Sequence, residues 1–381
     1  MQDSIYETDE HRAFREQIRR FVDEQVRPNA DAWEQAGEIP RDAFRRMGEL
    51  GFLGVRYPEA FGGAEMDTFG SVVLATELGR SGLSGFAIST LVHTDMASPH
   101  LERYGTQEQK ERYLPGIISG DLVTAVAVTE PGAGSDVAGI TTRAERRGNG
   151  WVLNGAKMFI TNGVLGDLYF VAAKSDVESK PSRGVSMFIV EKGTPGFSVA
   201  SQLDKMGWRC SDTAELVLDY VELPGDALLG SEGRGFYQIM DNFQNERLVI
   251  GAMAVGEAER ALEITLGYVR ERKAFGGTLW DKQAVRQKLA ECAGRCEAVK
   301  RLIDHTAWLD ASGRDCVREV SMIKAEAASM LQKVVYDCQQ VHGGAGYMRG
   351  MEIERLYRDA RVQAIGGGAT EVMLEEVAKR M

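Results

Sequence analysis

The sequence predicts an α+β multidomain protein, with an N-terminal all-α domain at 1–120, a middle antiparallel β domain at 121–231 and a C-terminal helical bundle domain at 232–381. Apolar residues recur at helical spacing in the first part. Short β-branched runs alternate with turn residues in the second. No proline follows Pro224 in a third part rich in Ala, Leu, Glu, Lys and Arg, the composition of long helices.

Helices are expected in the first part because Phe14, Ile18, Phe21 and Val22 recur with charged residues between them. The same pattern predicts helices at 42–50, 69–78, 83–91, 98–104 and 107–115. In the third part, the helices are expected near 233–272, 281–310, 314–341, 350–361 and 369–380. Four long helices in succession favour a bundle.

Strands are expected in the second part at 123–128, 151–153, 157–160, 167–172, 185–190, 197–200 and 215–221. Asn154-Gly155 and Asn162-Gly163 are turn or hairpin signals. No helical crossover separates these runs, so a small antiparallel sheet or barrel fits and a parallel dinucleotide-binding sheet does not.

Composition excludes several classes of function. A net charge of −11 argues against a nucleic-acid surface, and no apolar run approaches the length of a membrane span. The acidic first ten residues resemble neither a signal peptide nor a transit sequence, so a bacterial-type cytoplasmic location is expected. The five cysteines fit reduced thiols, and Cys292 and Cys296 with His305 lack a second ligand pair, so no metal is expected.

One stretch combines a strand with a flexible polar loop: Val128-Thr129-Glu130-Pro131-Gly132-Ala133-Gly134-Ser135-Asp136. Small residues after a strand let backbone N–H groups approach a large polar ligand, but Pro-Gly-x-Gly is also common turn chemistry. The sequence has no P-loop motif, and Gly132 and Gly134 lack the third glycine of the dinucleotide fingerprint. From these residues alone, an ordinary turn and a ligand loop both remain open.

Taken with four later stretches, this loop resembles the acyl-CoA dehydrogenases over essentially the whole chain. The first is Asn154-Gly155-x-Lys157-x-Phe159-Ile160-Thr161-Asn162-Gly163, the family's second middle-domain motif. The others, in the family's order, are Arg272-Lys273-Ala274-Phe275-Gly276, Gln340-Val341-His342-Gly343-Gly344-x-Gly346-Tyr347, and Tyr357-Arg358-Asp359-Ala360-Arg361 followed by Ile365-Gly366-Gly367-Gly368.

The resemblance implies FAD as cofactor and a homo-oligomer, typically a tetramer. Val128 and Thr129 would lie at the pyrimidine side of the flavin, Thr161 near N5, and Phe159 where many members have Trp. Ser135 would contact flavin or the CoA portion of the substrate. The remaining FAD positions are Arg272, Phe275, Gln340, Gly343, Gly344, Thr370 and Glu371, of which Gln340, Gly343 and Gly344 would reach the FAD of a neighbouring subunit. Gly343-Gly344 also fits a helix C-cap.

The family removes a proton next to the thioester carbonyl with a carboxylate and passes hydride from the next carbon to the flavin. Many members place a glutamate where this chain has Gly367. The long-chain and isovaleryl types carry it on the long helix before Arg272, which matches Glu246. Glu246 is therefore the expected base, although a glutamate on a helix is most often simply solvated.

The other substrate positions implied by the resemblance are Phe243, Arg247, Gly366 and Gly367, with Arg247 contacting either CoA or a structural partner. The acyl region at 82–92 carries no charge, and a dicarboxylic substrate would need a cation there. Gly82 and Gly85 could leave space for a long acyl chain, but the same uncharged sequence is equally consistent with a helix of the protein core.

The expected activity is oxidation of a medium- to long-chain acyl-CoA to its trans-2-enoyl-CoA in fatty acid β-oxidation, with electron-transfer flavoprotein as acceptor. The alternatives are a branched-chain (isovaleryl-type) or terpenoid acyl-CoA dehydrogenase, an oxidase of the same fold, and a catalytically silent CoA-binding relative.

Overall fold

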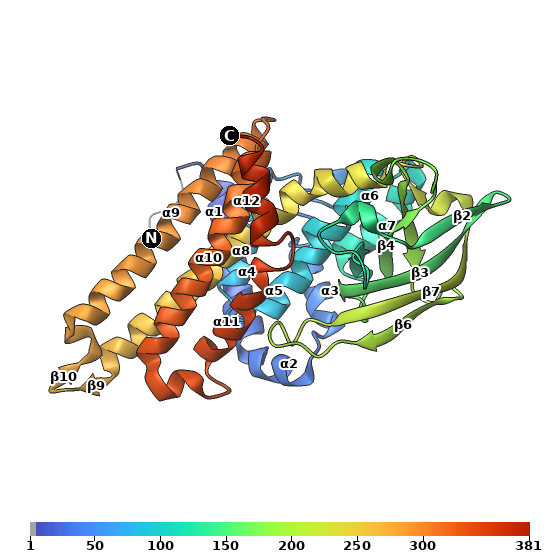
Figure 1. Cartoon of the computed structure of the whole chain (residues 1–381). Helices are drawn as coiled ribbons and strands as arrows, with labels where there is room; N and C mark the ends of the chain where they lie inside the picture. The colour runs from blue at the N-terminus through green and yellow to red at the C-terminus, as the bar shows by residue number, and fades with distance from the viewer. Residues whose placement is uncertain (1–4) are drawn as a thin grey trace.

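The computed structural model describes residues 5–381 and consists of one main β-sheet beside helices that come from both ends of the chain (Figure 1). The sheet lies at the right of Figure 1. The C-terminal helices pack on its left with part of the N-terminal helices, and other N-terminal helices lie against the sheet itself. The predicted fold class is confirmed. The residues at which each domain begins and ends remain a prediction.

The N-terminal part forms seven α-helices within the described residues: α1 (Asp9–Phe21), α2 (Ala30–Ala36), α3 (Arg41–Glu49), α4 (Thr68–Gly79), α5 (Ser84–Leu91), α6 (Pro99–Tyr104) and α7 (Gln107–Ser119). Helices α4 and α5 are buried on every side. The sequence of α5 carries no charge, and Glu77 is the one charged residue of α4. A π-helical turn, η4 (Val92–Ala97), follows α5 and becomes important for the site below.

The sheet holds eight strands: β1 (Thr124–Ala127), β2 (Arg143–Arg147), β3 (Gly150–Thr161), β4 (Leu168–Lys174), β5 (Val185–Glu191), β6 (Phe197–Gln202), β7 (Thr213–Leu223) and β8 (Leu228–Leu229). Its order is β6-β7-β3-β2-β4-β5-β8, with β1 beside β4. Pairing is mostly antiparallel, but β1 runs parallel to β4, and β2 also pairs with β4 in parallel, at Arg143 and Lys174. Residues of β4 alternate between the cores on the two faces of the sheet.

The expected turn at Asn154-Gly155 is wrong. The two short runs around it form one strand, β3, and Gly155 lies in a bulge of the β3–β7 pairing with φ of 156°. A side chain on Gly155 would place its Cβ 2.4 Å from the Thr142 hydroxyl, so close approach to the neighbouring chain explains the glycine. Asn162-Gly163 does form a turn, in which the Gly163 amide donates to the Ile160 carbonyl.

The C-terminal part contains α8 (Gly235–Glu271), α9 (Gln283–Ala311), α10 (Val317–His342), α11 (Glu352–Ala360) and α12 (Thr370–Ala378), close to the expected helices. A small hairpin, β9 (Lys273–Ala274) with β10 (Gly277–Thr278), follows α8. Short 3-10 segments, η9 (Gly343–Tyr347) and η10 (Arg361–Ala364), follow α10 and α11. Helix α8 packs against α4, η4, α9 and α10, so the two helical parts share one core.

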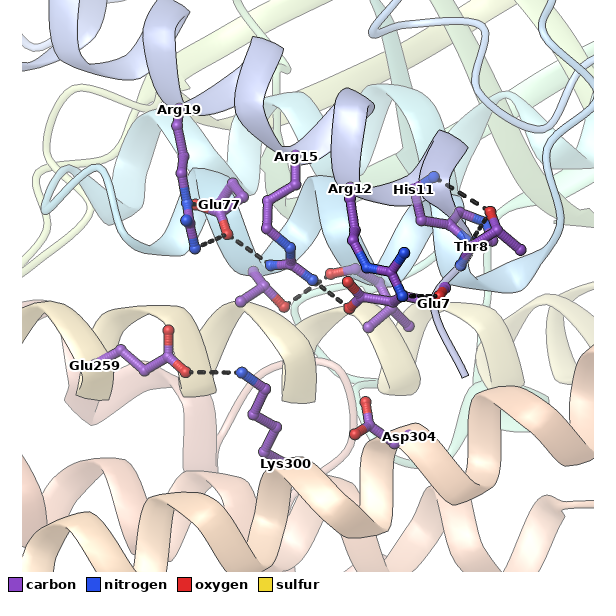
Figure 2. A network of polar contacts seen from close by, with 12 residues as sticks. Glu7, Thr8, His11, Arg12, Arg15, Arg19, Glu77, Glu259, Lys300 and Asp304 are labelled. Atoms are coloured by element: carbon purple, nitrogen blue, oxygen red, sulfur yellow. Dashed lines mark hydrogen bonds and ion pairs between the residues drawn. The ribbon is translucent and has the colours of Figure 1, made fainter. Parts of the chain in front are cut away.

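A buried polar network joins the two helical parts (Figure 2). Glu77 of α4 accepts a hydrogen bond of 2.6 Å from Arg15 of α1. Arg80 reaches Glu259 of α8 at 3.0 Å, and Lys300 of α9 donates to the same carboxylate at 3.2 Å. Glu77 and Glu259 are buried, and these partners compensate their lost hydration. Helix α8 is thereby fixed to the N-terminal helices along its central turns.

Candidate active site

Two asparagines of α8 fix this helix against η4. The Asn242 side-chain amide donates to the carbonyls of Asp95 (3.1 Å) and Met96 (3.0 Å). The Asn245 amide donates to the Asp95 carbonyl at 3.0 Å and to its carboxylate at 3.1 Å. The turn η4 in turn contacts β1, where the Thr124 amide donates to His93 Nδ1 at 3.1 Å. These contacts connect the segment preceding Glu246 to the strand that precedes the Val128–Asp136 loop.

Glu246 is half-buried and faces Gly367, in the loop between η10 and α12. A Cβ atom added to Gly367 would lie 3.2 Å from Glu246 Oε1 and 2.6 Å from Ile250 Cδ1. Gly367 also has φ of +64°, which side-chain-bearing residues rarely adopt. The chain therefore has room at this point for one carboxylate, and it comes from α8.

Burial raises the pKa of Glu246 to about 6, against the opposing effect of the positive charges of Arg247 and Lys324. A carboxylate with a pKa in this range is ionised at neutral pH and still gains a proton readily. Glu246 can therefore act as a general base, as the sequence predicts.

Arg247, the next residue, is buried and lies with its guanidinium 5.1 Å from the centre of the Phe243 ring. Its Nε is buried without a hydrogen-bond partner among residues 5–381. Burial lowers the pKa of Arg247, opposed by Glu246 and Glu376. Buried arginines are normally paired, so this one has hydrogen-bonding capacity left for a polar ligand.

The Val128–Asp136 loop is anchored by a buried ion pair. Lys157 of β3 donates to Glu130 Oε1 at 2.8 Å and to the Val128 carbonyl at 3.0 Å. Glu130 also accepts from the amides of Thr141 (2.6 Å) and Thr142 (3.0 Å). Burial disfavours the charged form of Glu130, but Lys157 and these donors together lower its pKa to about 2. The start of the loop is therefore rigid.

Four predicted flavin positions meet at this anchor. The Met158 amide donates to the Thr129 carbonyl at 2.9 Å, which places Val128 and Thr129 beside the end of β3 that carries Phe159 and Thr161. Phe159 lies at an irregularity of the β3–β7 pairing with φ of +60°, and the residue is 66% exposed. An aromatic side chain held outward from a strained position provides a flat surface for a planar ligand.

The rest of the loop is open to solvent. Gly132, Gly134 and Ser135 are exposed, and a Cβ on either glycine would meet no atom within 4 Å. Packing within the chain does not require these glycines. This cradle of exposed backbone fits the approach of a large ligand such as FAD or CoA.

The second group of predicted FAD positions lies at the other end of the helical bundle. Tyr268 of α8 stacks on His342 of α10 with ring centres 4.4 Å apart. This contact joins the last turn of α8, which precedes Arg272 and Phe275, to the last turn of α10, which precedes Gly343 and Gly344. The hairpin that carries Phe275 lies at the lower left of Figure 1, away from the sheet. Gln340 is exposed on the last turn of α10.

Thr370 and Glu371 begin α12, shortly after Gly366 and Gly367. The Thr370 hydroxyl donates to the Ala364 carbonyl at 3.5 Å, and Glu371 is exposed. The structure thus places these four residues in one loop and the helix start that follows it. The predicted FAD positions around Arg272 lie at a distance from this loop, at the end of the bundle that carries the β9–β10 hairpin (Figure 1).

Gly82 and Gly85 provide no space for an acyl chain. A Cβ on Gly82 would lie 2.0 Å from Glu352 Oε1, and one on Gly85 would lie 2.6 Å from Cys210 Sγ. Both glycines serve close packing within the chain. The sequence suggested both possibilities, and the core interpretation is the correct one here.

Three supporting residues received no role in the sequence analysis: Glu130, Lys157 and Lys324. Lys324 of α10 is 1% exposed and donates to the carbonyls of Gln363 (2.5 Å) and Gly368 (3.0 Å). A charged residue within the apolar pattern of a helix, such as Lys324 between Ile323 and Ala325, is the signal that could have found it.

Family models match the chain in three consecutive segments. The acyl-CoA dehydrogenase N-terminal domain matches residues 8–121, the middle domain 125–221 and the C-terminal domain 233–381. The chain belongs to the acyl-CoA dehydrogenase family. This oxidoreductase family is the one that its motifs resemble.

Relatives in this family agree over nearly the whole chain. The mouse long-chain specific acyl-CoA dehydrogenase of mitochondria is 41% identical over 98% of this chain and 86% of its own length. The isovaleryl-CoA dehydrogenase of Pongo abelii is 35% identical over 96% of this chain and 87% of its own. The crystal structure of an acyl-CoA dehydrogenase from Geobacillus kaustophilus has a TM-score of 0.95 at 40% identity, covering 99% of both chains.

FAD is confirmed as the cofactor at the level of the family. A glutaryl-CoA dehydrogenase from Mycobacterium smegmatis, solved in complex with FADH2, has a TM-score of 0.93 at 29% identity and covers 98% of this chain and 95% of its own. Another solved chain, from work on the electron transferring flavoprotein of Acidaminococcus fermentans, has a TM-score of 0.96 at 33% identity over 99% of both chains. Among residues 5–381, no helix has the length and apolarity to span a membrane.

Proposed function

We propose that this acyl-CoA dehydrogenase converts a saturated medium- to long-chain acyl-CoA to its trans-2-enoyl-CoA, with Glu246 as the base. The observation that carries the proposal is the position of the Glu246 carboxylate, 3.2 Å from the point where a side chain on Gly367 would begin. A base needs only to reach the proton, so its place in the sequence is free.

Glu246 takes the proton from the carbon next to the thioester carbonyl. The chemistry that FAD would supply when bound is acceptance of the hydride that leaves the following carbon. The thioester oxygen gains negative charge as the proton leaves, and the backbone N–H of Gly367 is a suitable donor for it. Arg247, with its unused hydrogen-bonding capacity, would contact the CoA portion, and Phe243 beside it would line the substrate channel.

The residues that would hold FAD lie in three places on one chain. Val128, Thr129, Ser135, Phe159 and Thr161 belong to the sheet side; Thr370 and Glu371 belong to α12. Arg272, Phe275, Gln340, Gly343 and Gly344 belong to the distant end of the bundle. Two chains would complete the site if Gln340, Gly343 and Gly344 reached the FAD of a neighbour, which supports a homo-oligomer, the tetramer typical of the family.

Substrate length and electron acceptor rest on similarity. The long-chain relative is more similar than the isovaleryl-CoA relative, at 41% against 35% identity. The uncharged α5 region favours an unbranched or branched aliphatic acyl group over a dicarboxylic one. Electron-transfer flavoprotein is the proposed acceptor and the cytoplasm the proposed location.

An anaerobic titration tests the proposal directly. The purified protein with FAD is mixed with acyl-CoA thioesters of graded length, with isovaleryl-CoA among them, and flavin absorbance is followed. We expect bleaching that is fastest with a medium or long straight chain. Glu246→Gln should bind the same thioesters but bleach ~10²–10⁴-fold more slowly, the typical contribution of a general base.

The outcomes separate the alternatives. Fastest bleaching by isovaleryl-CoA would replace the proposed substrate with a branched one. Bound FAD that no thioester bleaches would favour a silent CoA-binding relative. A Glu246→Gln variant with a near wild-type rate would remove the base assignment while keeping the activity.

A further inference from the structure

We propose that Lys324 is a positioning residue of this site, which holds the glycine loop against α8 and favours the ionised form of Glu246. This inference rests on the proposed function of Glu246 as base. Lys324 stands outside every motif that carries the family resemblance, and its role follows from its contacts alone.

First, Lys324 is hydrogen-bonded to both ends of the glycine loop. Its Nζ donates to the carbonyl of Gln363 at 2.5 Å and to that of Gly368 at 3.0 Å. These two carbonyls lie on either side of Gly366 and Gly367, so one ammonium group fixes both ends of the segment. A glycine backbone has more conformational freedom than that of any other residue. The two charge-assisted hydrogen bonds restrict this freedom and so give the Gly367 N–H a defined direction.

The second step is the position of Lys324 relative to Glu246. A Cβ atom on Gly367 would lie 3.5 Å from Lys324 Cε and 3.2 Å from Glu246 Oε1. Both side chains therefore approach the same point, from α10 and from α8. A positive charge this close to a carboxylate favours its ionised form.

The third step is the balance of charge around Glu246. Arg247 of α8 and Lys324 of α10 are the positive groups that lower the pKa of Glu246, against its burial. Glu376 of α12 and Arg380, which follows this helix, act on the pKa of Arg247 with opposite signs. At the other end of the loop, burial raises the pKa of Glu257 to about 8, so this partner of Gln363 is mostly uncharged at pH 7.

Lys324 itself carries its charge at neutral pH. Burial lowers its pKa to about 8, while Glu246 raises it. Two carbonyl acceptors suit an ammonium group, which has only hydrogen-bond donors. A lysine that only satisfied loop carbonyls would be structural, and it would leave the titration of Glu246 unchanged.

The test is the pH profile of flavin reduction in Lys324→Met and Lys324→Arg. We expect Lys324→Met to move the acidic midpoint of the rate to higher pH by about one unit and to lower the rate more than 10-fold, with little change in substrate affinity. Lys324→Arg keeps the charge with a different shape, so its midpoint should stay while its rate falls.

Lys205→Met is the matched control. Lys205 also donates to a backbone carbonyl, that of Ser211 at 2.5 Å, and burial also lowers its pKa to about 8. It follows β6, in the β part of the chain, so its loss should affect stability without moving the midpoint. A wild-type midpoint in Lys324→Met, or an equal shift in Lys205→Met, would overturn the proposal.

A second readout works without turnover. The thermal stability of the wild type, Glu246→Gln, Lys324→Met and the double variant is followed across pH, since the difference made by Glu246→Gln reports the titration of Glu246. We expect the midpoint of the Glu246 titration to lie at higher pH in the Lys324→Met background. A midpoint at the same pH in both backgrounds would overturn the proposal. If the protein showed this shift but its flavin were reduced by no thioester, the proposed function would be wrong, while the electrostatic coupling between Lys324 and Glu246 would stand.

Discussion

The proposed reaction needs the ionised carboxylate of Glu246, and this ionised form lowers the stability of the folded chain. Burial raises the pKa of Glu246 from 4.5 to about 6. Protonated Glu246 therefore contributes stability that is fully present below pH 4.5 and is lost as the pH rises through about 6. Glu246→Gln keeps an uncharged side chain of the same shape. We expect it to be more stable than the wild type at pH 7 by roughly 1–2 kcal/mol, and equally stable near pH 4.

Thermal unfolding of both proteins at these two pH values measures this difference. Glu326→Gln, which changes an exposed glutamate on α10, is the control and should change stability at neither pH. A Glu246→Gln variant less stable than the wild type at pH 7 would mean that the ionised carboxylate is stabilised in the folded chain.

Gly367 is required by both its backbone and its neighbours. Gly367→Ala would introduce a Cβ at 2.6 Å from Ile250 Cδ1 on a backbone with φ of +64°. We expect flavin reduction at least 10-fold slower, because the loop must move away from Glu246, and a loss of about 1–2 kcal/mol in stability. Gly267→Ala, on the exposed side of the same α8, meets no atom within 4 Å and should be neutral or slightly stabilising. Equal behaviour of the two variants in stopped-flow reduction would contradict this account.

At the scale of the element, the ion pair between Glu130 and Lys157 decides how rigid the proposed flavin loop is. Glu130→Gln leaves Lys157 buried with a weaker partner and weakens the bonds from Thr141 and Thr142. Breaking one side of such a pair costs about 3–5 kcal/mol, partly recovered here by local unfolding of the loop. We expect weaker FAD retention, measured as a higher Kd in fluorescence titration of the apoprotein, whereas Glu145→Gln on exposed β2 should retain FAD normally.

The helices and strands differ in how well the sequence predicts them. Long periodic helices such as α8 and α10 were predicted almost to their ends, because amphipathic spacing and the absence of proline are local signals. The strand β2 was missed because Arg143–Arg147 is charged and exposed, with only Ala144 buried. Asn154-Gly155 was misread because a bulge and a hairpin use the same residues, and only the partner strand distinguishes them.

The site shows the same division. Glu246 and the loop residues could be proposed from motifs, since order and spacing are visible in the sequence. The roles of Lys157 and Lys324 depend on contacts made at separations of 27 and 39 residues, with Glu130 and with Gln363. Nothing local in the sequence states which carbonyl or carboxylate a buried lysine will meet.

At the scale of the whole molecule, Glu77 connects the N-terminal helix to the rest of the fold. Its carboxylate is 1% exposed and pairs with Arg15 and Arg19 (Figure 2). We expect Glu77→Gln to lower stability by about 3–5 kcal/mol, because the buried Arg15 keeps its charge without full compensation. Glu263→Gln removes a half-exposed carboxylate that also contacts Arg80, and it should cost less than about 1 kcal/mol. Chemical denaturation of both variants compares them; equal costs would mean that burial of the network contributes little.

The exposed aromatic residues at the far end of the bundle argue for assembly at the same scale. Phe275 is 92% exposed and Tyr347 is 79% exposed, both beside the second group of proposed FAD positions. Large apolar side chains with this exposure are typical of interaction sites. We expect the wild type to form a homo-oligomer by native mass spectrometry, and Phe275→Ser to shift it toward smaller species and release FAD. Tyr220→Ser, on β7 with 53% exposure, should keep both the assembly and the cofactor. A wild-type monomer that retains FAD would show that one chain completes the site, and the residues around Arg272 would then need another role.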